Sequence, residues 1–323
     1  MQPLFPIEIN FTLFLQALGQ WLTTPFKLIT SLGNEQFYIL IMPLLFWCVD
    51  SVMGIRIGIM LLVSGGFKDF LKVVIHTPRP YWVDTGVKAI TSETSFGMPS
   101  GHSMDAASIW GAIAASQKRR WVTWLAVLLI FLIGLSRIYL GVHFLHDVLS
   151  GWLLGALLLW VYLKLEKRLA AWIKTKSLTF QLAAAFLFSI ALIALALLAR
   201  VLVRGWQMPV IWEENALSVG AAAPDPLNLH GVVTLAGVAF GMLGGLACWV
   251  KKYGMPQVGK KTYKLILRYL LGMAGVAILY LGLKVIFPES PEWLGQSLRY
   301  LRYALLGAWV TLVAPLIFRK LKI

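Results

Sequence analysis

Charge is scarce in this chain. Only 13% of its 323 residues are charged, against roughly 25% in a soluble domain, while 59% are hydrophobic and the mean hydropathy is +0.76. This scarcity excludes a disordered chain and argues against a soluble globule. Length alone predicts about two domains, but the composition predicts one polytopic membrane protein.

Cysteine and N-terminal basic residues are also scarce. The two cysteines, Cys48 and Cys248, lie in apolar runs, so we expect buried thiols and neither a disulfide nor a zinc framework. No basic residue precedes Lys27, so a cleaved signal peptide is not expected. Internal repeats are absent as well, which leaves a single bundle as the simplest architecture.

Apolar runs recur along the chain and predict an all-α integral membrane helix bundle of about nine transmembrane helices. The expected spans are 34–50, 52–71, 103–117, 121–137, 146–164, 178–200, 229–250, 266–287 and 301–318. Small residues predict faces where helices pack closely: Gly151, Gly155, Gly241, Gly244 and Gly245. The segment Asn10–Thr30 is amphipathic and is expected to lie at the membrane interface, with a further span as the alternative.

The basic residues predict an orientation. The chain has a net charge of +15, which in a soluble protein would suggest nucleic acid as a partner. Nine spans instead place the four basic clusters 118–120, 164–176, 251–264 and 319–322 on one side, which the positive-inside rule makes cytoplasmic. We therefore expect the N-terminus outside, the C-terminus in the cytoplasm and no nucleic-acid partner.

Three polar clusters interrupt the apolar pattern, and all fall at the predicted extracytoplasmic face. They are Lys72 to Pro80 (KVVIHTPRP), Pro99 to His102 (PSGH) and Ser136 to Asp147 (SRIYLGVHFLHD). One such cluster would be a weak signal. Three separate segments that converge on one side of the membrane predict a functional site.

The clusters supply groups that bind an anion. An arginine fork, at Arg79 or Arg137, matches two phosphate oxygens, and Lys72 adds a point charge. Ser100 is a good helix N-cap, and Gly101 lets the backbone approach a ligand closely. The N–H groups of that helix start suit an oxyanion.

The same clusters supply groups for acid–base and nucleophilic chemistry. His102 and His143 can act as an acid and a nucleophile near neutral pH. Asp147 follows His143 by one helical turn and can hold its ring N–H, as the aspartate does in a Ser-His-Asp triad. The histidines are not grouped with several carboxylates or thiolates, so we expect no metal site and no cofactor.

Together the clusters resemble the signature of the type 2 phosphatidic acid phosphatase superfamily, K-x6-R-P, P-S-G-H and S-R-x5-H-x3-D. Every position is present in 72–147, in order and at the family spacing. The strings RPYW, PSGH, LSRIYL and HF and the nine spans are similar to the glucose-6-phosphatase branch. Bacterial membrane members with extra C-terminal spans are equally similar. The resemblance implies a metal-independent phosphatase that works through a phosphohistidine.

The resemblance also implies roles and a division of the chain. His143 attacks phosphorus, His102 protonates the leaving oxygen and later activates water, and Asp147 supports His143. The phosphate oxygens are held by the remaining positions: Lys72, Arg79, Ser100, Gly101 and Arg137. The expected parts are an interfacial segment at 1–33, a six-span catalytic core at 34–200 and a three-span extension at 201–323.

Taken singly, each of these residues also has a structural interpretation, such as a lysine that snorkels to the interface. Residues near the motifs keep that interpretation. We expect His146 to be structural, Asp69 to pair with Lys68 or Lys72, and Tyr81 and Trp82 to anchor the loop at headgroup level.

The preferred substrate is a phosphate or diphosphate carried on a lipid that reaches the site laterally, with membrane lipids as the surrounding partners. A soluble sugar phosphate is the alternative within the same class. Phosphoryl transfer and halide oxidation, both known in the family, rank lower. A transporter or flippase is the non-enzymatic alternative. A bacterial inner membrane is the favoured location, with the site facing the periplasm; the sequence leaves the oligomeric state open.

Overall fold

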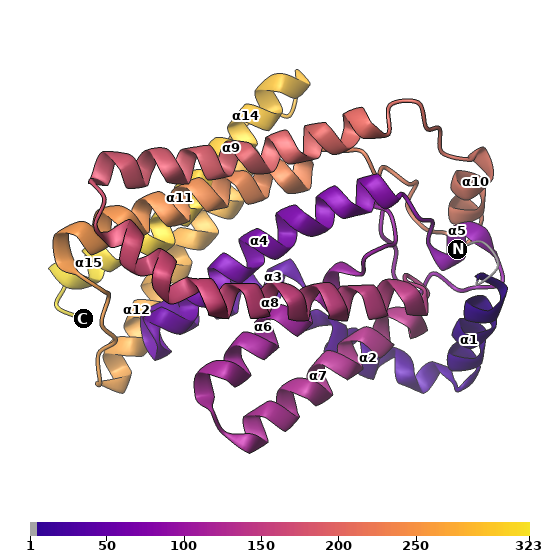
Figure 1. Cartoon of the computed structure of the whole chain (residues 1–323), viewed down its shortest axis with the longest axis horizontal. Helices are drawn as coiled ribbons and strands as arrows, with labels where there is room; N and C mark the ends of the chain where they lie inside the picture. The colour runs from indigo at the N-terminus through magenta and orange to yellow at the C-terminus, as the bar shows by residue number, and fades with distance from the viewer. Residues whose placement is uncertain (1–4) are drawn as a thin grey trace. The chain divides into compact units, whose positions relative to one another are not determined.

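The computed structural model describes residues 5–323, apart from the side chains of Glu35 and Gln36. The described part is all-helical, as expected (Figure 1). Its contacts divide it into two compact units. Unit 1 comprises Met1–Tyr38, Val63–Tyr162 and Leu197–Asn228, and unit 2 comprises Ile39–Leu62, Leu163–Ala196 and Leu229–Ile323.

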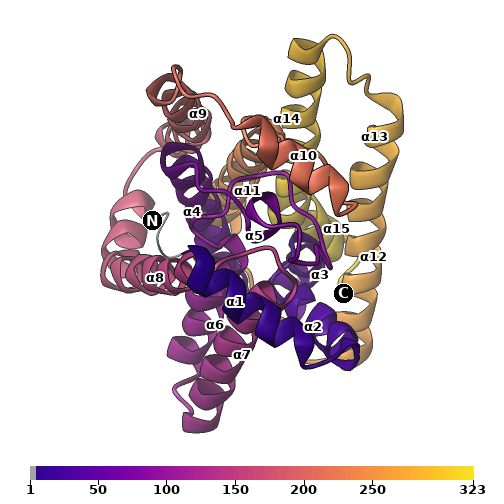
Figure 2. The ribbon, with the colours of Figure 1, turned by 90° about the vertical axis from the view of Figure 1, so that its right-hand side faces the viewer.

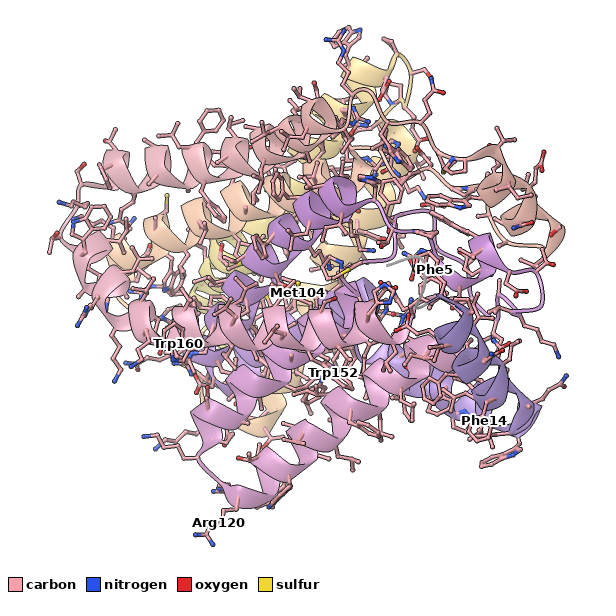
Figure 3. The ribbon with its side chains drawn as sticks, turned by 45° about the vertical axis from the view of Figure 1, so that its right-hand side comes forward. Phe5, Phe14, Met104, Arg120, Trp152 and Trp160 are labelled. Atoms are coloured by element: carbon pink, nitrogen blue, oxygen red, sulfur yellow. The ribbon has the colours of Figure 1, made fainter. Side chains whose placement is uncertain are left out.

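Unit 1 contains every motif residue. Its own helices are α1 Phe5–Ala17, η2 Gln20–Leu22, α2 Thr23–Ser31, α5 Pro80–Val83, α6 Gly101–Gln117, α7 Arg120–Tyr139 and α10 Val210–Ser218. It shares with unit 2 the helices α3 Glu35–Leu44, α4 Ser51–Ile75, α8 Leu145–Lys174 and α9 Leu178–Leu202. Figure 2 shows α6 and α7 as neighbours joined by a tight connection. At that connection Arg120 projects outward, far along the hairpin from the motif residues (Figure 3).

Local chemistry fixes the start of α6. Ser100 is the N-cap, and its Oγ accepts a hydrogen bond from Ser103 N at 3.4 Å. Two glycines of α8 then let α8 lie directly on this turn. A Cβ on Gly151 would lie 2.7 Å from the Ser100 carbonyl oxygen, and one on Gly155 would overlap the Met104 carbonyl. The predicted close packing at Gly151 and Gly155 is confirmed, and it sets α6 and α8 in register.

Unit 2 is held together by small residues and apolar packing. Beyond the shared helices it contains η3 Leu45–Val49, α11 His230–Tyr253, α12 Thr262–Ala277, η4 Ile278–Gly282, α13 Leu283–Ile286, α14 Glu292–Ala308, η5 Trp309–Val313 and α15 Ala314–Lys320. Gly241 packs so closely that an added Cβ would overlap the Ala304 carbonyl of α14. Thr311 Oγ1 donates to the Met242 carbonyl at 3.0 Å. The expected close-packed glycine face therefore lies between α11 and α14.

All nine expected spans are helical. Within the described residues, six helices are long and apolar enough to cross a membrane: Arg120–Tyr139, Leu145–Lys174, Leu178–Leu202, His230–Tyr253, Thr262–Ile286 and Glu292–Lys320. Phe14 and Trp160 are 60% and 59% exposed and point away from their unit, as expected for side chains that face lipid (Figure 3). The protein is thus a multi-pass helical membrane protein, and nine crossings stay a prediction.

The N-terminal region differs from the single amphipathic segment that we expected at Asn10–Thr30. It forms two helices, α1 and α2, separated by η2. The expected interfacial segment at 1–33 begins with residues 1–4, which lie outside the described residues. In its described part, several apolar side chains are exposed, including Trp21 at 72%, and some polar side chains contact the rest of unit 1. The division at 33 and 200 stays a prediction.

Candidate active site

Lys72 and Arg79, the first two motif cations, meet at one pair of acceptors. Lys72 Nζ donates to Ser95 Oγ at 3.0 Å and to the Phe96 carbonyl at 2.8 Å. Arg79 Nη2 donates to the same oxygens at 3.1 and 3.2 Å, and its Nε donates to the Ser95 carbonyl at 2.7 Å. Both side chains are buried. Two cations shielded from water create a strongly positive site, because charges are screened less there than at the surface.

His143 lies in the connection between α7 and α8 and is 1% exposed. Its Nε2 is 3.4 Å from Arg79 Nη1, and its Nδ1 is 3.2 Å from Asp147 Oδ2. Because a guanidinium only donates and a carboxylate accepts, the ring carries its proton on Nδ1 and presents the Nε2 lone pair to the cations. Burial, followed by the charges of Arg79 and Lys72, holds the pKa of His143 well below its usual range. The ring is therefore neutral and nucleophilic near neutral pH.

Asp147 joins three segments at its position in the first turn of α8. Besides His143, its Oδ2 accepts from Phe144 N at 3.0 Å, and its carbonyl accepts from Ser100 N at 2.9 Å. Gly97 comes so close that a Cβ there would lie 3.0 Å from Asp147 Oδ2. The PSGH turn and the histidine loop are thus bound to the same residue.

Gly101, at the start of α6, faces a lysine that the motif does not include. A Cβ on Gly101 would lie 3.2 Å from Lys68 Cδ and 3.5 Å from Lys68 Nζ. Lys68 forms an ion pair with Asp105 at 2.7 Å. Asp69 interacts electrostatically with both Lys68 and Lys72, the two partners that we expected for it.

Arg137, in the last turn of α7, is buried between two polar partners. Its Nη1 donates to Thr30 Oγ1 at 3.0 Å and its Nη2 to Glu93 Oε1 at 2.6 Å. Burial alone would raise the pKa of the Glu93 carboxyl, but Arg137 and then Arg79 hold that pKa well below its usual range. Arg137 Nε is buried and has no hydrogen-bond partner among the described residues. It is a donor that an incoming anion can use.

His102 lies in the first turn of α6, where its Nε2 is 2.6 Å from Asn34 Oδ1. It interacts electrostatically with Arg137, Glu93 and the two lysines of α4. The structure therefore gathers all eight expected residues in one part of unit 1: Lys72, Arg79, Ser100, Gly101, His102, Arg137, His143 and Asp147.

Several site residues were missed from the sequence. Glu93, Ser95 and Asn34 each contact a motif side chain. Glu93 and Ser95 lie in a loop without helical periodicity, and Asn34 is the first residue of the expected span 34–50, where no motif marks it. The order of the Glu93 loop depends on Tyr81, whose hydroxyl donates to the Glu93 carbonyl at 2.9 Å and accepts from Glu93 N at 3.0 Å. Tyr81 and Trp82 are fully buried, so the expectation of interfacial anchors was wrong. The Tyr81 hydroxyl and the buried area of both rings are used to fold the loop.

His146 makes contacts that fit its structural interpretation. Its Nδ1 lies 2.5 Å from Glu8 Oε2 on α1, and its Nε2 lies 3.2 Å from Asp147 Oδ1. Phe5 stacks on Phe144 at 4.8 Å beside this pair. The helix α1 thus covers the far side of the His143–Asp147 pair.

The donor set of the site suits an anion. In the part of the chain that the structure describes, no group of three His, Cys, Asp or Glu side chains could hold a metal ion. The site side chains are instead mostly cations and N–H donors, which match phosphate oxygens. Independence from metal stays a prediction.

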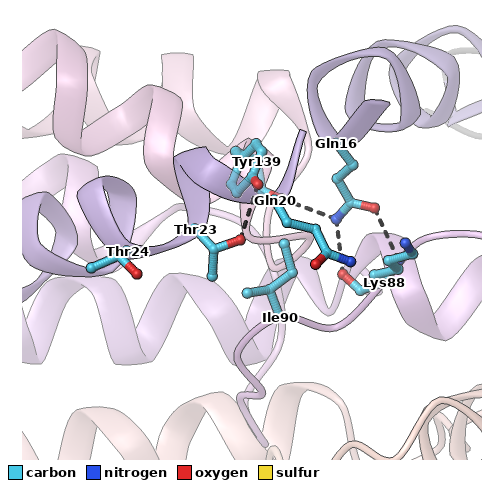
Figure 4. Close-up of a pocket in the computed structure, with 7 residues that line it drawn as sticks. All are labelled: Gln16, Gln20, Thr23, Thr24, Lys88, Ile90 and Tyr139. Atoms are coloured by element: carbon cyan, nitrogen blue, oxygen red, sulfur yellow. Dashed lines mark hydrogen bonds between the residues drawn. The ribbon is translucent and has the colours of Figure 1, made fainter. Parts of the chain in front are cut away.

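A separate open cavity of about 390 Å³ lies near the end of α7 (Figure 4). Gln16 bridges its rim, since its Nε2 donates to the Lys88 carbonyl at 2.9 Å and to the Tyr139 carbonyl at 3.0 Å. Its lining includes none of the eight expected site residues: Gln16, Gln20, Thr23, Thr24, Lys88, Ile90 and Tyr139. The motif cluster, where buried cations surround His143, is therefore the candidate active site.

The fold and the site define a class: a helical membrane protein with a buried histidine beside several buried cations. Comparison with known families gives the same class. Residues 54–171 match the family model described as PAP2 superfamily, and residues 233–323 match "PAP2 superfamily phosphatase, transmembrane extension". The chain belongs to the PAP2 superfamily of phosphatases, the family that its three motifs resemble.

Relatives support this assignment. Phosphatidylglycerophosphatase B of Bacillus subtilis is 34% identical over 154 residues, which cover 43% of this chain and 72% of that protein. Sphingosine-1-phosphate phosphatase 1 of Mus musculus is 34% identical over 143 residues, but the match spans only 33% of its length. A crystal structure of a transmembrane PAP2 type phosphatidylglycerolphosphate phosphatase from Bacillus subtilis aligns with a TM-score of 0.40 and 27% identity, covering 49% of this chain and 86% of that one.

Proposed function

We propose that the protein is an integral membrane phosphatase that hydrolyses a lipid phosphomonoester or diphosphate through a phosphohistidine, without a metal. The arrangement of His143 is the observation that carries the proposal. Its Nδ1 faces Asp147 at 3.2 Å and its Nε2 faces Arg79 at 3.4 Å. A neutral imidazole held in this tautomer can attack a phosphorus atom whose oxygens are bound by the neighbouring cations.

The other motif residues take complementary roles. Lys72, Arg79 and Arg137 neutralise the equatorial oxygens, together with the backbone N–H of Gly101, since the N–H of Ser100 is bound to the Asp147 carbonyl. Such electrostatic stabilisation contributes most of the rate enhancement in phosphoryl transfer. The Phe96 carbonyl, which now accepts from both Lys72 and Arg79, keeps the two cations in place before substrate arrives.

A lipid substrate is supported by the relatives and by the membrane fold. The similar proteins include phosphatases of sphingosine 1-phosphate and of phosphatidylglycerophosphate. The alternative, a sugar phosphate, is supported by the likeness to glucose-6-phosphatase catalytic subunit 1 of Mus musculus, 30% identical over 186 residues and 52% of that protein. The motif contacts only the phosphate, so it does not favour either substrate.

We propose that the site faces the extracytoplasmic side, with the C-terminus in the cytoplasm and a bacterial inner membrane as the location. The placement of the basic clusters supports this orientation. A transporter or flippase is the non-enzymatic alternative, and it predicts the opposite sensitivity. A transporter would tolerate His143→Ala better than the loss of a cation, whereas a phosphohistidine enzyme would not.

The test is phosphate release by purified protein in detergent micelles with EDTA present. A phosphatidic acid type lipid, a prenyl diphosphate and glucose 6-phosphate are compared, with His143→Ala as the blank. EDTA-resistant release from a lipid, lost in the variant, is the expected result. Release from glucose 6-phosphate alone would replace the substrate class, and release from none of the three would reject the enzymatic proposal.

A further inference from the structure

The N-terminal helices, which precede the matched family region at 54–171, reach the catalytic histidines and cations. Thr30, near the end of α2, accepts from Arg137, and Asn34, just before α3, meets His102. The approach of this turn is close: a Cβ on Gly33 would lie 3.1 Å from His102 Cδ2. This packing places the Asn34 amide against one edge of the His102 ring.

The contact selects a tautomer. Asn34 Oδ1 is 2.6 Å from His102 Nε2, and an amide oxygen only accepts, so Nε2 carries a proton. The remaining ring nitrogen, Nδ1, is then the one that can gain and lose a proton during a reaction. We propose that Asn34 is a positioning residue that holds His102 with Nε2 protonated, so that Nδ1 exchanges the proton with the leaving oxygen and with water. This inference rests on the proposed phosphatase function.

The proton balance follows from this geometry. The first step starts from the His102 imidazolium, which carries protons on both Nε2 and Nδ1. His143 Nε2 forms a bond to phosphorus, the ester P–O bond breaks, and the Nδ1 proton of His102 moves to the leaving oxygen. In the second step water attacks the phosphohistidine and gives its proton to His102 Nδ1, and the P–N bond breaks. Throughout both steps Asn34 keeps the Nε2–H occupied, which fixes the ring plane and stabilises the imidazolium.

Leaving-group dependence distinguishes this role from a merely structural one. An alkyl phosphate leaves as a strongly basic alkoxide and needs the proton from His102, whereas p-nitrophenyl phosphate leaves as a weakly basic phenolate. Loss of Asn34 should therefore lower kcat/KM far more for the alkyl ester. If the substitution only made the site less ordered, kcat/KM would fall by the same factor for both esters.

The experiment compares Asn34→Leu and Asn34→Asp with wild type in full-length protein. For Asn34→Leu, kcat/KM on a lipid phosphomonoester should fall about 10- to 100-fold, the range for removing an outer hydrogen bond that orients a histidine, with a much smaller fall on p-nitrophenyl phosphate. Asn34→Asp keeps an acceptor oxygen and should recover most of the lost rate. Asn10→Leu, the same change at an exposed position of α1, is the matched control.

The outcomes separate the two proposals. An inactive wild-type protein would reject the proposed function itself. An active wild type with an unaffected Asn34→Leu, or with equal losses on both substrates, would overturn the positioning role. Gel filtration and thermal unfolding show whether Asn34→Leu folds. If it does not, Asn34→Asp and Asn34→Ser allow the same comparison with smaller volume changes. Asn34→Ser should then lose more kcat/KM on the lipid ester than on the aryl ester, and equal losses would reject the inference.

Discussion

The two units use buried side chains in opposite ways. Among its described residues unit 1 buries seven Asp, Glu, Lys, Arg or His side chains, namely Glu8, Lys72, Arg79, Asp105, Arg137, His143 and Asp147, whereas the described part of unit 2 buries one, Arg302. Burying a charge is costly unless it is paired and hydrogen-bonded, and each of those in unit 1 has a hydrogen-bond or ion-pair partner. Both units pack glycines against backbone, at Gly151 and Gly155 in unit 1 and at Gly241 in unit 2. The units therefore differ in buried charge, which unit 1 gathers around the candidate site.

The largest effect should come from Asp147→Asn. The amide can present its NH2 group to His143 Nδ1 and favour the tautomer with its proton on Nε2, which removes the nucleophilic lone pair. By analogy with triad aspartates, turnover should fall about 10³-fold or more, with thermal unfolding little changed. Asp225→Asn, in the exposed loop after α10, is the matched control. Retention of turnover within tenfold would show that His143 does not depend on this carboxylate.

The second change targets unit 2. Gly241→Ala introduces a Cβ that overlaps the Ala304 carbonyl, so we expect a loss of about 1–3 kcal/mol in the free energy of unfolding. Turnover per folded molecule should stay at the wild-type value. Gly244→Ala, whose Cβ would lie 3.4 Å from Leu182 Cδ2, is an ordinary contact on the same helix and serves as the control. Equal thermal midpoints for the two variants would contradict the packing argument.

The third change tests the ionic network of unit 1 through pH. Burial alone would raise the pKa of Glu93 in the folded protein, but the positive charge of Arg137 lowers it below its usual range. Its stabilising effect is therefore fully present above its unfolded pKa of about 4.3 and is lost as pH falls toward the folded value. The difference in thermal midpoint between wild type and Glu93→Gln should stay constant from about pH 7 to 5 and shrink below about 4. A difference that grows on acidification would reverse the sign and reject the ion pair.

The smallest effect is expected at Arg56 and Glu166 in unit 2. Arg56 Nη2 lies 2.7 Å from Glu166 Oε1, and both side chains are partly exposed, at 17% and 16%. Glu166→Gln should cost up to about 1 kcal/mol, less at high salt, and should leave kcat and KM unchanged. Thermal unfolding at two salt concentrations measures this. If Glu166→Gln changed kcat or KM, a charge pair in unit 2 would affect turnover as well, and the two units would differ less than their buried charges suggest.

Much of the fold and the site could be predicted from the sequence. Apolar runs located every long helix, because 20 apolar residues have few other structures in a membrane. Motif spacing located Lys72, Arg79, His102 and His143, since each lies at a fixed distance from a helix end. Glu93 and Asn34 could not be found, because their roles depend on where two loops return in space. The apolar pattern of the N-terminal helices does not indicate the polar contacts that the ends of these helices make.

The glycines of α8 have a consequence for the surrounding bilayer. Since Gly151 and Gly155 set the backbone of α8 against that of α6, the two helices can tilt only as a pair. A change in bilayer thickness is accommodated mainly by helix tilt. The spacing between His102 on α6 and Asp147 on α8 is then preserved when acyl chains lengthen or shorten. Vesicles of different acyl-chain length should therefore alter how substrate reaches the site, while the reaction geometry stays constant.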